Sequence, residues 1–414
     1  MSTQNEPSES QNEKVDIDQK KRTHFKIGSR KSKLAMVQSE YIQARLTELY
    51  PEYTFEIVNF DTKGDKILNI ALPKIGDKGL FTKELEDALE DGRIDFVVHS
   101  LKDMPCQTLP DNLTISGVPE REDPSDALVI AERLRETKKT IDDLEENSIV
   151  GTSSLRRIAQ LKEKYPKLKF ETIRGNLQTR FSKMDNEKKF DAIILATAGL
   201  NRMKYNDRIS QILPSEICMH AVSQGALGIE SRRDDLDVIK MINRLNHEET
   251  LLRCVAERTF LAKLEGGCSA PIAVKSSVSE KSIILEGAVF NLEGTTRIQD
   301  KFEMHFEDDK NCPLLNVSNE EQNVNQDNDE QLNSKRTSVE KDEISSPKRK
   351  KTLETNEPEI KQLVKHYCYI TDLSIDENKM LKAELCGLHL AQKLKEKGAD
   401  ILIEEIKIQV HSSM

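Results

Sequence analysis

The sequence predicts an α/β protein with a smaller α+β domain at its C-terminal end. From about residue 25 to residue 228, short apolar runs alternate with stretches whose apolar side chains recur at helical spacing. From about residue 247, a long helical pattern is followed by runs of alternating polar and apolar residues, which indicate antiparallel strands. The length of 414 residues suits two or three domains. The first pattern therefore predicts sheets covered by helices, and the second pattern predicts a separate domain.

In the α/β part, the expected elements follow one another closely. A strand at 25–27 opens the series, and residues 34–50 carry apolar side chains at helical spacing. Further strands are expected at 54–60, 95–99, 149–151, 170–173 and 192–196, and further helices at 83–90, 155–164 and 177–184. Gly92 is placed to end the helix at 83–90. Ligands of such folds bind at the ends of strands, so the residues that follow the strands are the first candidates for a site.

The C-terminal part is expected to be an α+β domain with an interruption. Helices are expected at 249–264 and 378–396, the second ended by Gly398, and strands at 282–290, at 298–306 and from near Leu363. No aromatic residue occurs between Phe306 and Tyr367, and that interval is rich in Asn, Glu, Gln, Ser and Lys. Such a composition buries too little apolar surface to fold, which predicts a disordered insert.

Composition excludes several classes of protein. The net charge of −10 argues against nucleic-acid binding, and no apolar run approaches 18 residues, so no transmembrane helix is expected. Residues 1–23 are polar and charged, so we expect neither a secretory signal nor a mitochondrial presequence there. The seven cysteines are scattered, without the spacing of a zinc site, which favours reduced thiols, no metal and a cytoplasmic location. Walker and dinucleotide-binding motifs are absent from the sequence.

Basic residues recur where a predicted strand passes into a predicted helix. The motifs are Gly28-Ser29-Arg30-Lys31-Ser32, Ser100-Leu101-Lys102-Asp103, Ser153-Ser154-Leu155-Arg156-Arg157 and Ile173-Arg174-Gly175-Asn176-Leu177-Gln178-Thr179-Arg180. Backbone N–H groups at a helix N-terminus favour anions, and arginine adds a planar fork that fits a carboxylate or a phosphate. The pattern predicts a ligand that carries several negative charges.

Some residues of interest also have a structural interpretation. Asp103 could stabilise a cation or hold an N–H donor, but a salt bridge or a helix cap is the commoner role of such an aspartate. Ser153 and Ser154 could likewise be caps. Cys268 follows two glycines and closely precedes Pro271. This spacing predicts an accessible loop and a thiol used for attachment or attack, with an ordinary loop residue as the alternative.

Taken together and in this order, the motifs resemble those of the porphobilinogen deaminase (hydroxymethylbilane synthase) family. Further matching motifs lie at 62–65, 79–84, 99–103, 151–157, 196–200, 224–228 and in Glu265-Gly266-Gly267-Cys268-Ser269. The resemblance runs from about residue 25 to residue 402, apart from the insert. One departure is Ser223, where many members have glycine, which puts the local backbone geometry in question.

The resemblance implies a fold of two domains like those of type II periplasmic binding proteins, plus a smaller α+β domain that carries the cofactor. We divide the chain accordingly into a disordered extension at 1–23, a first domain at 24–119 and 223–246, a second at 120–222 and a third at 247–306 and 359–414. The low-complexity insert takes up 307–358.

The activity that the resemblance implies is the condensation of four porphobilinogen molecules into the linear tetrapyrrole hydroxymethylbilane, with release of ammonia. The reaction is primed by a dipyrromethane cofactor attached covalently through Cys268. Asp103 would be the catalytic residue, holding pyrrole N–H groups and stabilising positive charge. The cofactor would be bound by Lys102, Ser153, Ser154, Arg156, Arg157, Arg180, Gln224 and Gly225. The substrate would be bound by Arg30, Ser32, Arg174 and Arg202.

Two other functions are considered. A non-catalytic anion-binding module would explain the arginines, but it would need neither Asp103 nor Cys268. A nuclear interaction protein would rest only on 346–351, where Ser-Pro and four basic residues match an import or phosphorylation signal and a solvated run of charge is the favoured interpretation. We expect a monomeric cytoplasmic transferase of haem biosynthesis that binds neither nucleic acid nor membrane. The alternative for its location is an additional nuclear pool, directed by residues 347–351.

Overall fold

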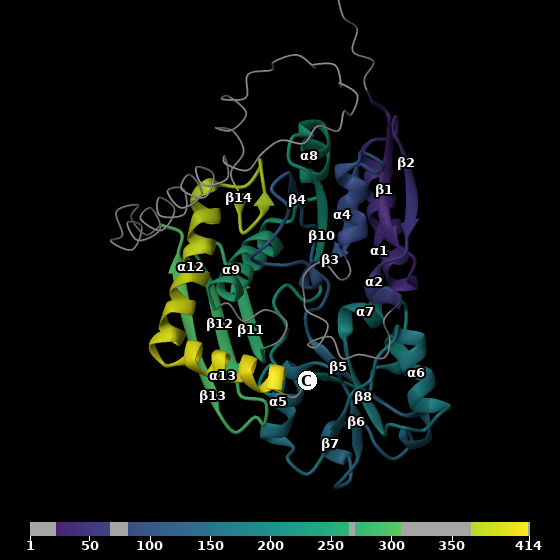
Figure 1. The fold of residues 1–414 in the computed structure, drawn as a ribbon, viewed down its shortest axis with the longest axis vertical. Coiled ribbons are helices and arrows are strands. Elements are labelled where there is room, and N and C mark those ends of the chain that lie inside the picture. The colour runs from purple at the N-terminus through teal and green to yellow at the C-terminus, as the bar shows by residue number, and fades with distance from the viewer. Residues whose placement is uncertain (1–21, 67–81, 265–269, 308–365, 413–414) are drawn as a thin grey trace, which may run out of the picture.

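The first lobe of the molecule is built on a mixed seven-stranded sheet (Figure 1). The computed structural model describes residues 22–66, 82–264, 270–307 and 366–412. The strands lie in the order β14 (His366–Tyr367), β15 (Ile370–Thr371), β4 (Leu113–Gly117), β10 (Leu227–Arg232), β3 (Phe96–Ser100), β1 (His24–Arg30) and β2 (Thr54–Phe60). Strand β1 pairs in parallel with β2 and β3, whereas β10 runs antiparallel to β3 and β4.

Helices cover both faces of this sheet because successive side chains of a strand point to opposite faces. Phe96 and Val98 of β3 pack in one apolar cluster with side chains from α1 (Lys33–Leu49) and α8 (Leu236–Asn243). Val97, between them, packs in another cluster with α4 (Lys83–Glu90). The short helix α2 (Lys63–Lys66) follows β2. Gly92 follows α4 with φ of +67°, which suits the predicted helix end.

The second lobe contains a five-stranded sheet in the order β7 (Lys169–Glu171), β6 (Ile149–Gly151), β8 (Ala192–Ala196), β5 (Asp126–Ile130) and β9 (Gln211–Leu213). Strand β6 is parallel to β7 and β8, and β5 is antiparallel to β8 and β9. Its helices are α5 (Leu155–Lys164), α6 (Leu177–Asp185) and α7 (Thr197–Arg202). The chain passes between the lobes twice, at 118–125 and at 214–226, which we call the first and second crossover segments.

The third domain is an antiparallel sheet of β11 (Ile272–Val278), β12 (Ser282–Phe290) and β13 (Arg297–His305). Its helices are α9 (Glu248–Leu264), α12 (Glu377–Glu396) and α13 (Ala399–Ser412). Side chains of α9, α12 and the sheet belong to the same buried apolar cluster as α4 and β4 of the first lobe. The third domain and the first lobe therefore share a continuous core.

The predicted fold class is confirmed. Strands at 54–60, 149–151, 192–196 and 282–290 and helices at 83–90 and 155–164 have the predicted bounds, and the other predicted elements that lie within the described residues shift by at most three residues. Elements that the sequence did not predict include β4, β5, β9, β10, β11, α7, α8 and α13. The extension at 1–21, most of the insert and the strand expected from near 363 lie outside the described residues.

One pairing differs from the predicted division of the chain. Residues 366–371 were placed in the third domain, but β15 pairs with β4 and so extends the sheet of the first lobe. The pairing follows from the shared core, because β15 leads into α12 of the third domain while its Ile370 packs in the common cluster. Among the described residues, no helix is long and apolar enough to cross a bilayer.

Candidate active site

The site lies where the two lobes and the crossover segments meet, and Lys102 and Asp103 enter it from the first lobe. Both belong to the 3₁₀ turn η1 (Leu101–Asp103), which directly follows β3. Leu101 is buried, and its N–H donates to the carbonyl oxygen of Ala226, directly before β10, at 3.0 Å. This hydrogen bond fixes the start of the turn. Asp103 is exposed. It caps no helix, and no ion pair within 4 Å involves it in the described part of the chain. This argues against the interpretation of Asp103 as a salt-bridge or helix-capping residue.

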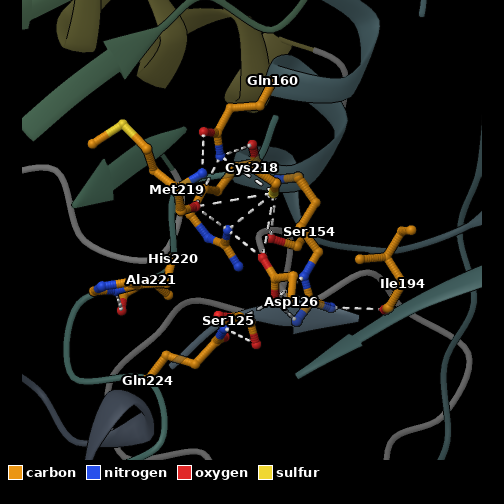
Figure 2. Close-up of polar contacts among 12 residues, drawn as sticks. Ser125, Asp126, Ser154, Gln160, Ile194, Cys218, Met219, His220, Ala221 and Gln224 are labelled. Atoms are coloured by element: carbon orange, nitrogen blue, oxygen red, sulfur yellow. Dashed lines mark hydrogen bonds and ion pairs between the residues drawn. The ribbon is translucent and has the colours of Figure 1, made fainter. Parts of the chain in front are cut away.

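A buried carboxylate from the second lobe, Asp126 at the start of β5, organises two of the predicted arginines (Figure 2). Arg156 Nη1 donates to Oδ2 of Asp126 at 2.7 Å and to the carbonyl oxygen of Met219 at 2.6 Å. Arg157 donates to Oδ1 of Asp126 through Nε at 3.0 Å and through Nη2 at 2.7 Å. The three side chains are 0–8% exposed. Two guanidinium groups thus share one carboxylate.

Gln224, from the second crossover segment, joins Lys102 to this cluster, and Figure 2 shows Gln224 beside Ser125 and Asp126. Its Nε2 donates to Oδ1 of Asp126 at 2.9 Å and to the carbonyl oxygen of Pro124 at 2.6 Å. Its Oε1 accepts a hydrogen bond from Nζ of Lys102 at 3.5 Å. The predicted residues Lys102, Arg156, Arg157 and Gln224 are therefore brought together, around an aspartate that the sequence did not single out.

The charges in this cluster do not balance. Burial acts to raise the pKa of Asp126, but Arg156 and Arg157 outweigh it and hold that pKa well below its usual range, so the carboxyl is ionised. Cys218 lies beside it, and burial together with Asp126 raises the pKa of this thiol to about 12, so it remains neutral. Among the described residues, two arginine cations therefore face one anion, which leaves one positive charge in excess.

A second group of basic residues lines the turn between β7 and α6. Ser153 Oγ donates to the carbonyl oxygen of Ile173 at 2.7 Å, and Arg180 Nε donates to that of Gly175 at 2.8 Å. Burial, reinforced by the neighbouring cations of Arg157 and Arg174 and opposed by Asp103, lowers the pKa of Arg180 to about 10. The main cause is the removal of this cation from water, and the nearby cations add to it.

Burial likewise disfavours the charged forms of Arg174 and Lys102. Nη1 of Arg174 is buried and has no hydrogen-bond partner among the described residues, and burial lowers the pKa of this side chain. Burial also lowers the pKa of Lys102, which Asp103 opposes and Arg157 reinforces. The electrostatic influence of Asp103 on both Lys102 and Arg180 shows that the first lobe's turn faces the second lobe's arginines.

Gly225 and Arg202 meet at the second crossover segment. Arg202, the last residue of α7, donates from Nη2 to the carbonyl oxygen of Gly225 at 2.7 Å. Gly225 has φ of +89°, and a Cβ atom there would lie 2.2 Å from the carbonyl oxygen of Glu122 in the first crossover segment. Glycine is therefore required where the two crossover segments approach each other. Ser223, two residues earlier, has φ of +57°, the left-handed conformation that suits the glycine of many relatives.

The remaining predicted residues have local roles or lie elsewhere. Ser154 is the N-cap of α5, where its side chain accepts from the N–H of Arg157, and Ser32 caps α1 by accepting from Ala35 at 3.3 Å. Arg30 ends β1 and is half-exposed. Cys268 lies outside the described residues, between the end of α9 and the start of β11.

Asp126 could have been suspected from the sequence. It directly precedes the apolar run 127–131 and follows Pro124 and Ser125, so it lies at the N-terminal end of a buried strand. An acidic residue at such a place needs a cation, and the arginine pair at 156–157 is one of two adjacent basic pairs in the motifs at the predicted turns. What the sequence does not reveal is that the two come together.

Residues 25–240 match the family model "Porphobilinogen deaminase, dipyromethane cofactor binding domain", and residues 251–315 match "Porphobilinogen deaminase, C-terminal domain". A porphobilinogen deaminase of Synechococcus elongatus is 49% identical over 277 residues, which are 67% of this chain and 85% of that protein. Another, from Prochlorococcus marinus (strain MIT 9215), is 51% identical over 277 residues, 67% of this chain and 86% of that protein.

Among solved structures, the VFT2 domain of BvgS from Bordetella pertussis aligns over 54% of this chain and 86% of its own, with 14% identity and a TM-score of 0.34. The alkanesulfonate-binding protein SsuA from Xanthomonas axonopodis pv. citri aligns over 60% of this chain and 77% of its own, with 12% identity and a TM-score of 0.31.

Proposed function

The chain belongs to the porphobilinogen deaminase family, and we propose that the basic residues between its lobes, together with Asp103, form the active site for that family's reaction. The reaction condenses four porphobilinogen molecules head-to-tail into hydroxymethylbilane and releases ammonia at each step. The chain is accordingly a transferase of tetrapyrrole biosynthesis that uses a dipyrromethane cofactor.

The observation that carries the proposal is the excess of positive charge at the meeting point of the lobes. Porphobilinogen carries an acetate and a propionate, so each added pyrrole ring brings two carboxylates. Arg156 and Arg157 share a single carboxylate, and Arg174 has a buried donor without a partner among the described residues. Buried cations of this kind are stabilised when anionic ligands arrive, and arginine can hold each carboxylate through two hydrogen bonds.

The residues present fit a dipyrromethane group. We propose that Lys102, Arg156, Arg157 and Arg180 supply cations for its carboxylates, and that Ser153, Ser154, Gln224 and Gly225 supply hydroxyl, amide and backbone groups around it. The attachment would be a thioether to Cys268, which follows α9 in the sequence. When bound, the group provides the pyrrole carbon to which the first substrate is joined.

Asp103 is proposed to handle the charge that develops during condensation. Loss of ammonia from porphobilinogen leaves an electron-poor ring, and the attacking pyrrole becomes positively charged as the new bond forms. An exposed carboxylate that neighbours Lys102 and Arg180 can accept pyrrole N–H donors and stabilise that charge where it develops. Arg30, Ser32, Arg174 and Arg202 are proposed to bind the carboxylates of the incoming substrate.

Substitution of Asp103 by asparagine tests this role. The change keeps the size of the side chain but removes its charge, so we expect turnover to fall by about 10²-fold or more, the scale for losing a preorganised electrostatic contact. Covalent cofactor should still be present, as roughly 420 Da of added mass on the intact protein. A variant with near-normal turnover would contradict the catalytic role. Wild-type protein without the added mass and without activity would contradict the proposed function itself.

We also propose that the protein is monomeric and cytoplasmic. The described cysteines, at 106, 218, 254, 368 and 386, are free thiols, which suits a reducing compartment. Light scattering after size-exclusion chromatography would test the first statement, since a mass near twice 47.1 kDa would contradict it.

A further inference from the structure

The backbone that carries Lys102 and Asp103 is held in place by the third domain. Turn η1 runs into the segment 104–109, which passes over α9 and the β14–β15 hairpin. The strongest of these contacts comes from Arg258 on α9, a residue with no part in the proposed binding of substrate or cofactor. Its side chain is fully buried, at 0% exposure.

Arg258 donates to backbone carbonyl oxygens on both sides of Asp103. Nη2 donates to Pro105 at 2.6 Å, and Nη1 lies 3.3 Å from the oxygen of Met104 and 3.5 Å from that of Leu101. Leu101 precedes Asp103 by two residues, and Met104 and Pro105 follow it directly. One guanidinium therefore spans the whole turn that presents the proposed catalytic carboxylate.

The charge of Arg258 is not neutralised by a nearby acid. In the part of the chain that the structure describes, no carboxylate lies within 4 Å of its guanidinium, and its Nε has no hydrogen-bond partner. A buried cation without a carboxylate beside it is costly, and the partners of Arg258 are backbone carbonyl oxygens and the Cys368 side chain. An arginine at this place therefore points to a geometric task, because its fork reaches several carbonyls that an apolar side chain would leave unpaired.

Other contacts from the third domain hold the continuation of the same segment. Gln107 donates from Nε2 to the carbonyl oxygen of Ala262 on α9 at 2.8 Å. The Tyr369 hydroxyl, from the β14–β15 turn, donates to the carbonyl oxygen of Gln107 at 2.7 Å. The Cys368 thiol donates to the backbone carbonyl oxygen of Cys106 at 3.5 Å. The segment after Asp103 is thus fixed to the third domain at successive residues.

Helix α9 also makes a second connection through the neighbouring residue. Glu257 accepts two hydrogen bonds from Arg121 in the first crossover segment and one from the N–H of Ser223 in the second, at 2.7 to 3.0 Å. The same helix ends at Leu264, four residues before Cys268 in the sequence. One helix therefore contacts both crossover segments and the turn with Asp103, and it ends close in sequence to the proposed attachment residue.

We propose that Arg258 is a positioning residue: it sets the backbone of turn η1 and thereby aims the Asp103 carboxylate at the reacting pyrrole. This inference rests on the proposed catalytic role of Asp103. It makes the third domain responsible for aligning the catalytic carboxylate as well as for carrying the cofactor. Misplacing a catalytic group by about 1 Å can cost 10²-fold in rate, so a contact outside the site can have a large effect on turnover.

The test is a double-mutant cycle with Arg258→Met and Asp103→Asn, each measured for kcat and KM on protein with full cofactor mass. We expect Arg258→Met to lower kcat by tenfold or more, about the scale of a displaced group, with little change in KM. In the Asp103→Asn background, the same change should lower kcat by less than about threefold, because the group that Arg258 aims has already lost its charge. Arg253→Met, on the same helix, serves as the control for loss of an arginine and should leave kcat near normal.

Two outcomes would overturn the proposal. One is an Arg258→Met enzyme whose kcat matches wild type, and the other is a full additional loss in the Asp103→Asn background, which would mean that Arg258 supports the fold in general. If Arg258→Met does not fold, Arg258→Lys takes its place in the cycle, because it keeps the cation but loses the fork. Should wild type be active and Asp103→Asn normal, the proposed role of Asp103 fails first, and the inference fails with it.

Discussion

Two buried ionic clusters of this molecule look alike but differ in charge balance. At the crossover segments, Arg121 and Glu257 form a one-to-one pair through two hydrogen bonds of 2.7 and 3.0 Å. At the start of β5, Asp126 instead receives Arg156 and Arg157 together, each at 2.7 Å. The first cluster is neutral, whereas the second keeps one positive charge in excess among the described residues.

The difference separates a cluster that holds the fold from one that is suited to a ligand. Glu257 also accepts the N–H of Ser223 and the hydroxyl of Ser276, so its oxygens are fully used. Burial acts to raise the pKa of Glu257, but Arg121 and His220 lower it to about 2, which keeps the carboxylate ionised. A buried ion pair with its partners complete has no need of a ligand, but unbalanced buried cations are stabilised by anions from outside.

The largest expected effect comes from breaking the balanced cluster. Glu257→Gln leaves Arg121 as a buried cation without a counter-charge, so the free energy of unfolding should fall by about 3–5 kcal/mol. Urea and thermal unfolding measure the loss. Glu249→Gln is the matched control on the same helix, because its carboxylate is half-exposed and pairs with Arg253, and it should cost no more than about 0.5 kcal/mol.

Acid titration supplies a second check on Glu257. Because its pKa in the folded protein is depressed to about 2 from a usual 4.5, its contribution to stability is complete above pH 4.5 and is lost as the pH falls toward 2. The stability difference between wild type and Glu257→Gln should therefore shrink over that interval. A difference that stays constant would show that the pair is not the source of the effect.

A smaller effect on stability, but a clear one on function, is expected in the unbalanced cluster. Arg157→Leu leaves Asp126 and Arg156 as a neutral pair, so the melting temperature should fall less than in Glu257→Gln. Binding of the anionic tetrapyrrole chain should weaken by about 2–5 kcal/mol, the scale for losing a charged partner in a closed site. Native mass spectrometry would show this as missing cofactor or stalled elongation.

Arg133→Leu controls for loss of an arginine in the same lobe, since Arg133 pairs with Asp191 near the surface. If Arg157→Leu instead destabilises the fold as much as Glu257→Gln while elongation stays normal, charge balance does not distinguish the two clusters.

The smallest expected effect concerns the backbone that links the clusters. Ser223 donates its N–H to Glu257 from a left-handed conformation with φ of +57°. Ser223→Gly keeps that N–H and removes the steric cost, so stability should rise by up to about 1 kcal/mol. Gly225→Ala is the opposite control and should destabilise, because its Cβ would lie 2.2 Å from the carbonyl oxygen of Glu122. A destabilised Ser223→Gly would show that the serine hydroxyl contributes more than the strain costs.

Much of the local structure could be predicted because it depends on neighbours in the sequence. Helix α5 and strand β6 have the predicted bounds, and Ser154 caps α5 as its position before the helix suggested. Strand β5, which carries Asp126, was not predicted, although its apolar run is of the same kind and length as that of the predicted strand β8. Strands β14 and β15, of two residues each, are shorter than any pattern can reveal.

By itself, the sequence determined which residue types stand at the ends of the strands and in what order, and this order was enough to indicate the family. Only the tertiary structure decided which of these charges are neutralised. Arg156 and Asp126 are 30 residues apart in the chain, and Arg258 and Pro105 are 153 apart. Whether such groups meet depends on how the lobes and the third domain pack together. A charged side chain is available to a ligand only if this packing leaves it without a partner of opposite charge.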